Sequence, residues 1–128
     1  MIERDISMLE LRGEPIGIVN ATSSVSEVFQ NETLRPILKL QNDLFLEVFK
    51  NHIGKTKTDF TNLTVDKKMH FIENSIQKDI KFRNALKGMI LGLFSIEEYL
   101  SYTENSSELN KRMMNMLIER LKSQVQLF

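Results

Sequence analysis

The chain has 128 residues with 17 basic and 17 acidic side chains, and 41% of its residues are hydrophobic. This composition is typical of one folded domain and excludes a disordered chain. The chain also lacks the positive excess of a typical nucleic-acid-binding module. With no cysteine, five glycines and two prolines, it also excludes disulfides, thiolate metal sites and turn-rich β-barrels or sandwiches.

Residues 1–23 predict an irregular or extended N-terminal arm. Its apolar residues at three- and four-residue spacing favour a short helix that ends before Gly13, whereas Pro15 and Gly17 favour extended backbone over residues 14–19. No other segment predicts a strand, so we expect this arm to pack on the helices or on a partner chain.

Two features of the sequence argue against a secreted or membrane protein. The first residues are acidic, whereas a secretory signal begins with basic residues. The longest apolar stretch, residues 89–94, is far shorter than the ~20 residues that span a bilayer. We therefore expect a cytoplasmic protein without membrane contact.

Residues 24–128 predict a helical domain that begins with a capping box at residues 24–27. From residue 34 to residue 53, apolar side chains recur at three- and four-residue steps, which predicts the strongest helix of the chain. Thr33 is its expected N-cap, Pro36 lies in its first turn, and Gly54 is its expected end.

Two further helical patterns follow between residues 65 and 94. Thr64 is the expected cap of the first and Asp79 of the second, but neither glycine nor proline separates the two patterns. One long helix with a kink therefore stays open as an alternative to two helices. Gly88 and Gly92 lie on one helical face, where we expect them to allow close packing of another segment.

Capping residues at 95–98 and at 105–108 begin a short helix and the last long helix. The whole pattern predicts an all-α fold. We expect a compact helical bundle of three to four long helices plus short helices, preceded by the N-terminal arm.

His70 and Glu73 are the most concrete candidates for chemistry. At positions i and i+3 of a predicted helix they share one face, and Tyr99 or Tyr102 would complete a pocket between helices. A metal centre in a bundle needs about four inward ligands with paired Glu-x-x-His motifs, which this sequence lacks. Nucleophile and glycine-rich phosphate motifs are absent as well, so we expect no metal, no cofactor and no catalytic residue.

A polar face on the helix predicted after Asp79 indicates a further possibility. Its basic and amide side chains would suit contacts with a nucleic acid, as in a helix-turn-helix. The preceding turn lacks glycine and the chain has no basic excess, so the composition argues against nucleic-acid binding and favours a solvated face. The residues are Lys81, Arg83, Asn84 and Lys87.

The last predicted helix carries more apolar residues than one core-facing stripe needs. Together with the apolar residues that end the chain, this predicts burial against a second subunit, so we expect a homodimer or a complex with a protein partner. The candidate interface residues are Met113, Met114, Met116, Ile118, Val125, Leu127 and Phe128.

Three runs of sequence, at residues 31–45, 82–90 and 109–114, resemble a family of short bacterial all-α proteins of unknown function, some of which carry a glyoxalase label. The resemblance implies no established catalytic residues. A glyoxalase fold would need βαβββ units with His and Glu metal ligands on strands, whereas His52 and His70 lie on predicted helices. We therefore treat that label as misleading.

These observations lead us to expect a non-enzymatic protein-interaction or self-associating module. One alternative is a ligand-binding protein or enzyme with a pocket near His70 and Glu73. Another is nucleic-acid binding through the polar face defined above. A cleft in which His70 and Glu73 converge with other polar groups would favour the first alternative.

Overall fold

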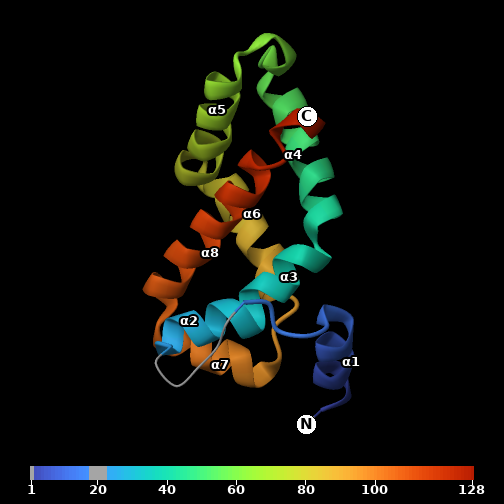
Figure 1. The fold of residues 1–128 in the computed structure, drawn as a ribbon, viewed down its shortest axis with the longest axis vertical. Coiled ribbons are helices and arrows are strands. Elements are labelled where there is room, and N and C mark those ends of the chain that lie inside the picture. Colours follow the sequence, from blue (N-terminus) through green and yellow to red (C-terminus); the bar gives the residue numbers. More distant parts are fainter. Residues whose placement is uncertain (1, 18–22) are drawn as a thin grey trace.

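The computed structural model describes residues 2–17 and 23–128, and every regular element among them is a helix. The predicted all-α fold is therefore confirmed. Figure 1 shows an elongated molecule with helices gathered at two ends and between them. α4 (Asn42–Thr56) and α5 (Val65–Lys78) form one end, α1 (Glu3–Arg12), α2 (Val25–Phe29) and α7 (Ile96–Glu104) form the other, and α3 (Arg35–Leu40), α6 (Ile80–Leu91) and α8 (Ser106–Lys122) lie between them.

The hydrophobic core is centred on α8, whose neighbours are α5 and α6. The buried side chains of α8 form two adjoining stripes at helical spacing, so this helix buries a wide apolar face. Fully burying one such side chain stabilises the fold by about 1.5–3 kcal/mol. The buried residues of α8 are Leu109, Met113, Met114, Leu117, Ile118 and Leu121.

Aromatic side chains fill the core at the end formed by α4 and α5. The ring centroid of Phe49 lies 5.0 Å from that of Phe128 and 6.1 Å from that of Phe71. One turn along α4, His52 stacks on Phe82 with the ring centroids 3.9 Å apart and the planes at 9°. Burial in this cluster lowers the pKa of His52, because the neutral imidazole is easier to bury than the charged form.

Side-chain caps begin α5 and α6 where the sequence predicts them. The Thr64 hydroxyl accepts the Lys67 N–H at 3.2 Å, and the Asp79 carboxylate accepts the Phe82 N–H at 3.1 Å. The backbone at Asp79 is extended, with ψ at 97°. Residues 65–94 therefore hold two separate helices and not one kinked helix.

The chain is already helical where the sequence predicts the start of its strongest helix. A π-helical turn, Gln30–Leu34, joins α2 to α3, so the prediction that Thr33 caps a helix is wrong. Pro36 lacks the N–H that would bind the Glu32 carbonyl in a regular α-helix. The Arg12 guanidinium of α1 replaces it, since Nη2 donates to the Glu32 oxygen at 3.2 Å.

The same predicted helix is broken in its middle and extends further than expected. The chain turns at Gln41, where ψ is 1°, and α4 then passes Gly54 and ends at Thr56. The break shifts the helical register, so Leu44, which an unbroken stripe would bury, is 46% exposed. Lys57 follows in the left-handed conformation with φ at 57°, a position that glycine commonly takes.

The region predicted as an irregular or extended arm begins with a regular helix, α1, of ten residues. It ends at Gly13, whose φ of 76° is typical of a helix terminator. The short helix predicted to end before Gly13 is therefore confirmed, but it docks through two buried charged side chains, Asp5 and Arg12, which its apolar spacing does not indicate. Residues 14–17 have no regular structure, and residues 18–19, also predicted to be extended, lie outside the described residues.

A buried ion pair between Arg12 and Glu98 holds α1 on the domain. Arg12 Nη1 and Nη2 donate to the two carboxylate oxygens of Glu98 at 2.5 and 2.7 Å, and the two side chains are only 2% and 18% exposed. Glu98 also accepts the Ser95 N–H, which completes the predicted capping box of α7, and the Thr33 hydroxyl, both at 2.7 Å. Burial alone would raise the pKa of Glu98, but these hydrogen bonds and the charge of Arg12 hold it below its ordinary value.

The predicted close packing at Gly88 and Gly92 is wrong. Both glycines are exposed on the surface of α6 and its end. A Cβ atom at Gly88 would meet no atom of another segment within 4 Å, and one at Gly92 would meet only the Gly88 carbonyl oxygen, at 3.2 Å. Their spacing therefore serves no contact with a neighbouring segment.

Candidate functional site

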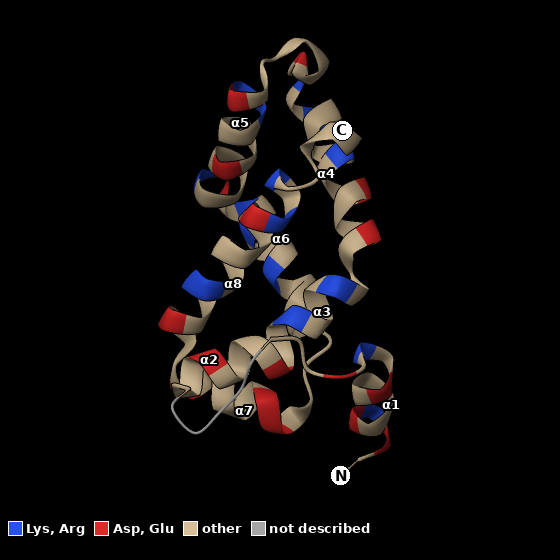
Figure 2. Ribbon diagram, viewed as in Figure 1, with Lys and Arg blue, Asp and Glu red and all other residues tan. Residues whose placement is uncertain are grey.

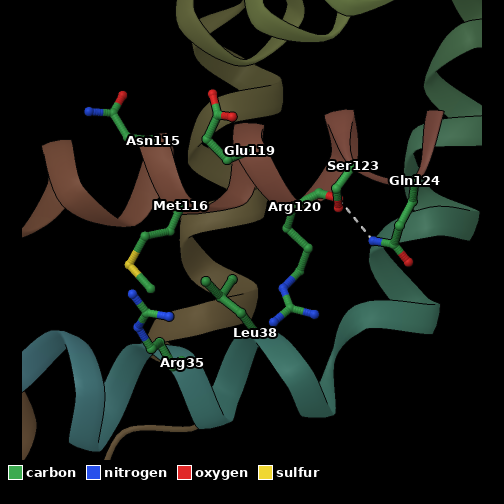
Figure 3. A pocket seen from close by; sticks show the side chains of 8 residues that line it. All are labelled: Arg35, Leu38, Asn115, Met116, Glu119, Arg120, Ser123 and Gln124. Atoms are coloured by element: carbon green, nitrogen blue, oxygen red, sulfur yellow. Dashed lines mark hydrogen bonds between the residues drawn. The ribbon is translucent and has the colours of Figure 1, made fainter. Parts of the chain in front are cut away.

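A groove with a volume of about 520 Å³ lies between α3 and the second half of α8 (Figure 3). Met116 and Arg120 point from α8 towards Arg35 and Leu38 on α3, so side chains of both helices meet in it. Figure 2 shows that α3 carries basic residues and no acidic one. The lining residues are Arg35, Leu38, Asn115, Met116, Glu119, Arg120, Ser123 and Gln124.

Each of the two arginines borders a buried stripe of its own helix. Arg35 lies between Leu34 and Pro36, which are both buried, and Arg120 directly precedes the buried Leu121. An arginine in such a position lays its methylene stem along apolar surface and keeps its charged head at the edge. Since both edges face the groove, the two guanidinium groups line it on either side of Leu38 in Figure 3.

Neither arginine of the groove is neutralised by a carboxylate. Among the described residues, no ion pair includes Arg35 or Arg120. Glu119 also lines the groove, but its side chain points to the other side of α8 and lies 3.9 Å from Lys122 Nζ. The site therefore holds two positive charges without a counter-charge between them.

The two guanidinium groups are also partly dehydrated. Among the residues that the structure describes, the buried Arg35 Nε has no hydrogen-bond partner, and the Arg120 side chain makes one long contact, from Nη1 to Asn42 Oδ1 at 3.4 Å. Burial, followed by the like charge of Arg35, lowers the pKa of Arg120. Partial dehydration and repulsion between the two charges are separate causes that act in the same direction, since each disfavours the charged form of Arg120.

A pair of side-chain amides holds the far end of the groove. Asn42 Nδ2 donates to Gln124 Oε1, and Gln124 Nε2 donates back to Asn42 Oδ1, both at 2.8 Å. Gln124 Nε2 also lies 3.0 Å from the Arg120 carbonyl oxygen, the contact drawn in Figure 3. This pair of hydrogen bonds joins α4 to the segment that follows α8, and the contact with the Arg120 carbonyl fixes the backbone from which the Arg120 side chain projects.

The arrangement of groups in the groove suits binding and offers little for catalysis. A guanidinium group presents its N–H donors in a planar fork that matches carboxylate and phosphate oxygens. It stays protonated at neutral pH and cannot act as a base. The Ser123 hydroxyl donates to the Arg120 carbonyl at 2.7 Å, so no side-chain base activates it as a nucleophile.

The structure does not bring together the residues predicted to form a pocket near His70. His70 is exposed on α5 beside a different hollow of about 580 Å³, whereas the Glu73 carboxylate binds Lys122 Nζ at 3.2 Å. Tyr99 and Tyr102 lie on α7, at the opposite end of the molecule in Figure 1. Within residues 2–17 and 23–128, no three His, Asp or Glu side chains are grouped so that they could hold a metal ion.

The residues predicted to contact a second subunit lie mainly in the core of this chain. Met113, Met114 and Ile118 are at most 4% exposed, and Leu127, at 50%, is the exposed member of the set. The partly buried members, Met116, Val125 and Phe128, pack against the same core. Most of the apolar side chains that led to the homodimer prediction are therefore buried in the core of this chain.

The residues of the predicted polar face lie at the surface of α6. Lys81 and Asn84 are exposed, and Arg83 and Lys87 are half-buried. The structure also has no helix, within its described ranges, that is long and apolar enough to cross a membrane.

Comparisons of the chain with protein-family models, curated proteins and solved structures found no match. The resemblance to short bacterial proteins therefore stays a prediction. Sequence reasoning missed the groove because Arg35 and Arg120 belong to no motif. The available signal was weak. Each arginine lies at the edge of an apolar stripe, and charged residues are common at such edges in any soluble helix, so the position alone does not indicate a binding site.

Proposed function

We propose that the protein is a non-enzymatic binding module that takes an anionic ligand in the groove between α3 and α8. The observation that carries this proposal is that Arg35 and Arg120 line one groove, close enough for the charge of Arg35 to act on Arg120, without a carboxylate between them. Two like charges held together and partly dehydrated cost free energy, which a bound anion would offset. Nature commonly uses such arginine pairs to bind carboxylates and phosphates.

The structural setting supports a binding role in several ways. Both arginines come from one chain, so the site needs no second copy. The amide pair of Asn42 and Gln124 holds the end of α8 in place, and a site with fixed donors loses little entropy when a ligand arrives. The groove volume lies in the range of small-ligand sites, about 300–1,000 Å³. Self-association and a protein partner remain separate expectations that this groove does not require.

The test is a calorimetric titration with inorganic phosphate at low ionic strength. We expect binding to the unaltered protein, and affinity reduced roughly 10- to 100-fold by Arg35→Gln or Arg120→Gln, since a hydrogen bond to a charged group contributes about 1.5–3 kcal/mol. Arg112→Gln is the matched control. Arg112 lies on the same helix, but its guanidinium already binds Glu108 at 3.1 Å and Gln30 at 2.9 Å. Equal affinities in all four proteins, or no binding to any of them, would contradict the proposal.

A further inference from the structure

The groove between α3 and α8 has an apolar part as well as a charged part. Leu38 lies between the two arginines in Figure 3, and Met116 extends into the groove on the side of Arg35. Leu38 is 1% exposed and fixed in the core, whereas Met116 is half-buried at its edge. A methionine side chain has three rotatable bonds and adapts to irregular apolar shapes.

The size of the groove exceeds what a small inorganic anion needs. One water molecule takes about 30 Å³ of liquid volume, and the groove encloses about 520 Å³. An anion placed between Arg35 and Arg120 would therefore leave most of the groove to water, part of which lies against the half-buried Met116. Removing water from such apolar surface is favourable.

We propose that the ligand is an amphipathic carboxylate, with its anionic head between Arg35 and Arg120 and an aliphatic or aromatic body along Met116. This inference rests on the proposed function and adds the chemical class of the ligand. The two guanidinium groups supply the charge-assisted hydrogen bonds, and the apolar wall supplies the affinity that an inorganic anion cannot gain. A carboxylate suits this site because its two oxygens match the planar donor fork of one arginine and leave lone pairs for the second.

The experiment is a titration of the full chain with linear carboxylates of increasing length, from acetate to octanoate, below the concentrations at which they aggregate. Each methylene that enters the groove should increase affinity about fourfold, until the chain is longer than the groove. Arg35→Gln should weaken every member of the series by a similar factor. Met116→Ser should flatten the dependence of affinity on chain length.

Octylamine serves as the charge control, because it carries the same body with a cationic head. Tight binding of octylamine would overturn the inference, since it would indicate unspecific apolar adsorption. If carboxylates bind with dependence on Arg35 but with equal affinity at all lengths, the amphipathic ligand is excluded and the anion site stands. If neither phosphate nor any carboxylate binds the unaltered protein, the anion site itself is excluded.

Discussion

Replacing Arg12 by methionine tests how α1 is held on the domain. Methionine fills a similar volume but removes the two hydrogen bonds to Glu98 and the one to the Glu32 carbonyl. Breaking a buried ion pair by removing one partner costs about 3–5 kcal/mol, because the remaining charge is left buried. Glu98 keeps two other donors, the Ser95 N–H and the Thr33 hydroxyl, so we expect the lower end, about 3 kcal/mol.

Urea unfolding at neutral pH, followed by far-ultraviolet circular dichroism, measures this loss. Lys50→Met is the control, because Lys50 and Glu47 form an ion pair at 3.3 Å with side chains 45% and 72% exposed. Exposed pairs contribute about 0–1 kcal/mol, so this variant should unfold nearly as the unaltered protein does. If Arg12→Met costs no more than Lys50→Met, the ion pair does not anchor α1.

The same variant has a predicted pH signature. Hydrogen bonds from Arg12, Ser95 and Thr33 outweigh burial and hold the pKa of Glu98 below its ordinary value of 4.5. The folded state therefore binds fewer protons than the unfolded state, so this stabilisation is present above pH 4.5 and is lost as the pH falls through the folded pKa. Arg12→Met should show a smaller loss of stability on acidification than the unaltered protein.

Three further variants test single features of the fold. Gly88→Ala should raise the free energy of unfolding by up to about 1 kcal/mol in a urea titration, because a Cβ atom there meets no other segment. A lower free energy of unfolding would mean that another segment packs closely on Gly88. Lys57→Gly should stabilise by about 1 kcal/mol in the same assay because it relieves the left-handed backbone, and no gain would argue against that conformation. Burial lowers the pKa of His52 in the folded state. As the pH falls below the ordinary value of 6.5, the unfolded chain therefore takes up a proton on this imidazole before the folded protein does, and the protein is destabilised. His52→Phe should remove that part of the pH dependence in thermal melts, and an unchanged pH profile would exclude His52 as its source.

The starts of α5, α6 and α7 could be predicted because each depends on contacts within one turn, whereas the expected cap of α8, Asn105, makes no side-chain capping hydrogen bond. The side chain of Thr64 and the N–H that it accepts are three residues apart, and the same holds for Asp79 and for Ser95 with Glu98. The sequence pattern predicts such contacts where no distant partner competes, but Thr33 lies inside a π-helical turn and its hydroxyl donates to Glu98 instead.

The features that the sequence did not predict depend on contacts between distant segments. The π-helical turn before Pro36 exposes backbone carbonyls that the N-terminal segment binds: Arg12 donates to Glu32, and the Ile16 N–H donates to the Asn31 oxygen at 3.0 Å. No pattern within one helix predicts that these distant donors bind the carbonyl groups. An apolar stripe, likewise, does not say whether the same chain or a second one covers it.

The groove depends on tertiary packing in the same way. Arg35 and Arg120 are far apart in the chain, and each looks like an ordinary surface arginine in its own helix. Only the tertiary arrangement of α3 and α8 brings the two charges to one groove and partly buries Arg120. A charge pair of this kind becomes visible only when side-chain positions are known.

An NMR titration of the arginine side-chain Nε–H resonances with phosphate tests the anion site most directly. The buried Arg35 Nε has no partner in the described part of the chain, so its resonance should move in a saturable way as the anion binds, together with that of Arg120. The Arg112 resonance, already engaged with Glu108, should stay in place. Unchanged Arg35 and Arg120 resonances at millimolar phosphate, or equal unsaturable shifts of every arginine, would contradict the account.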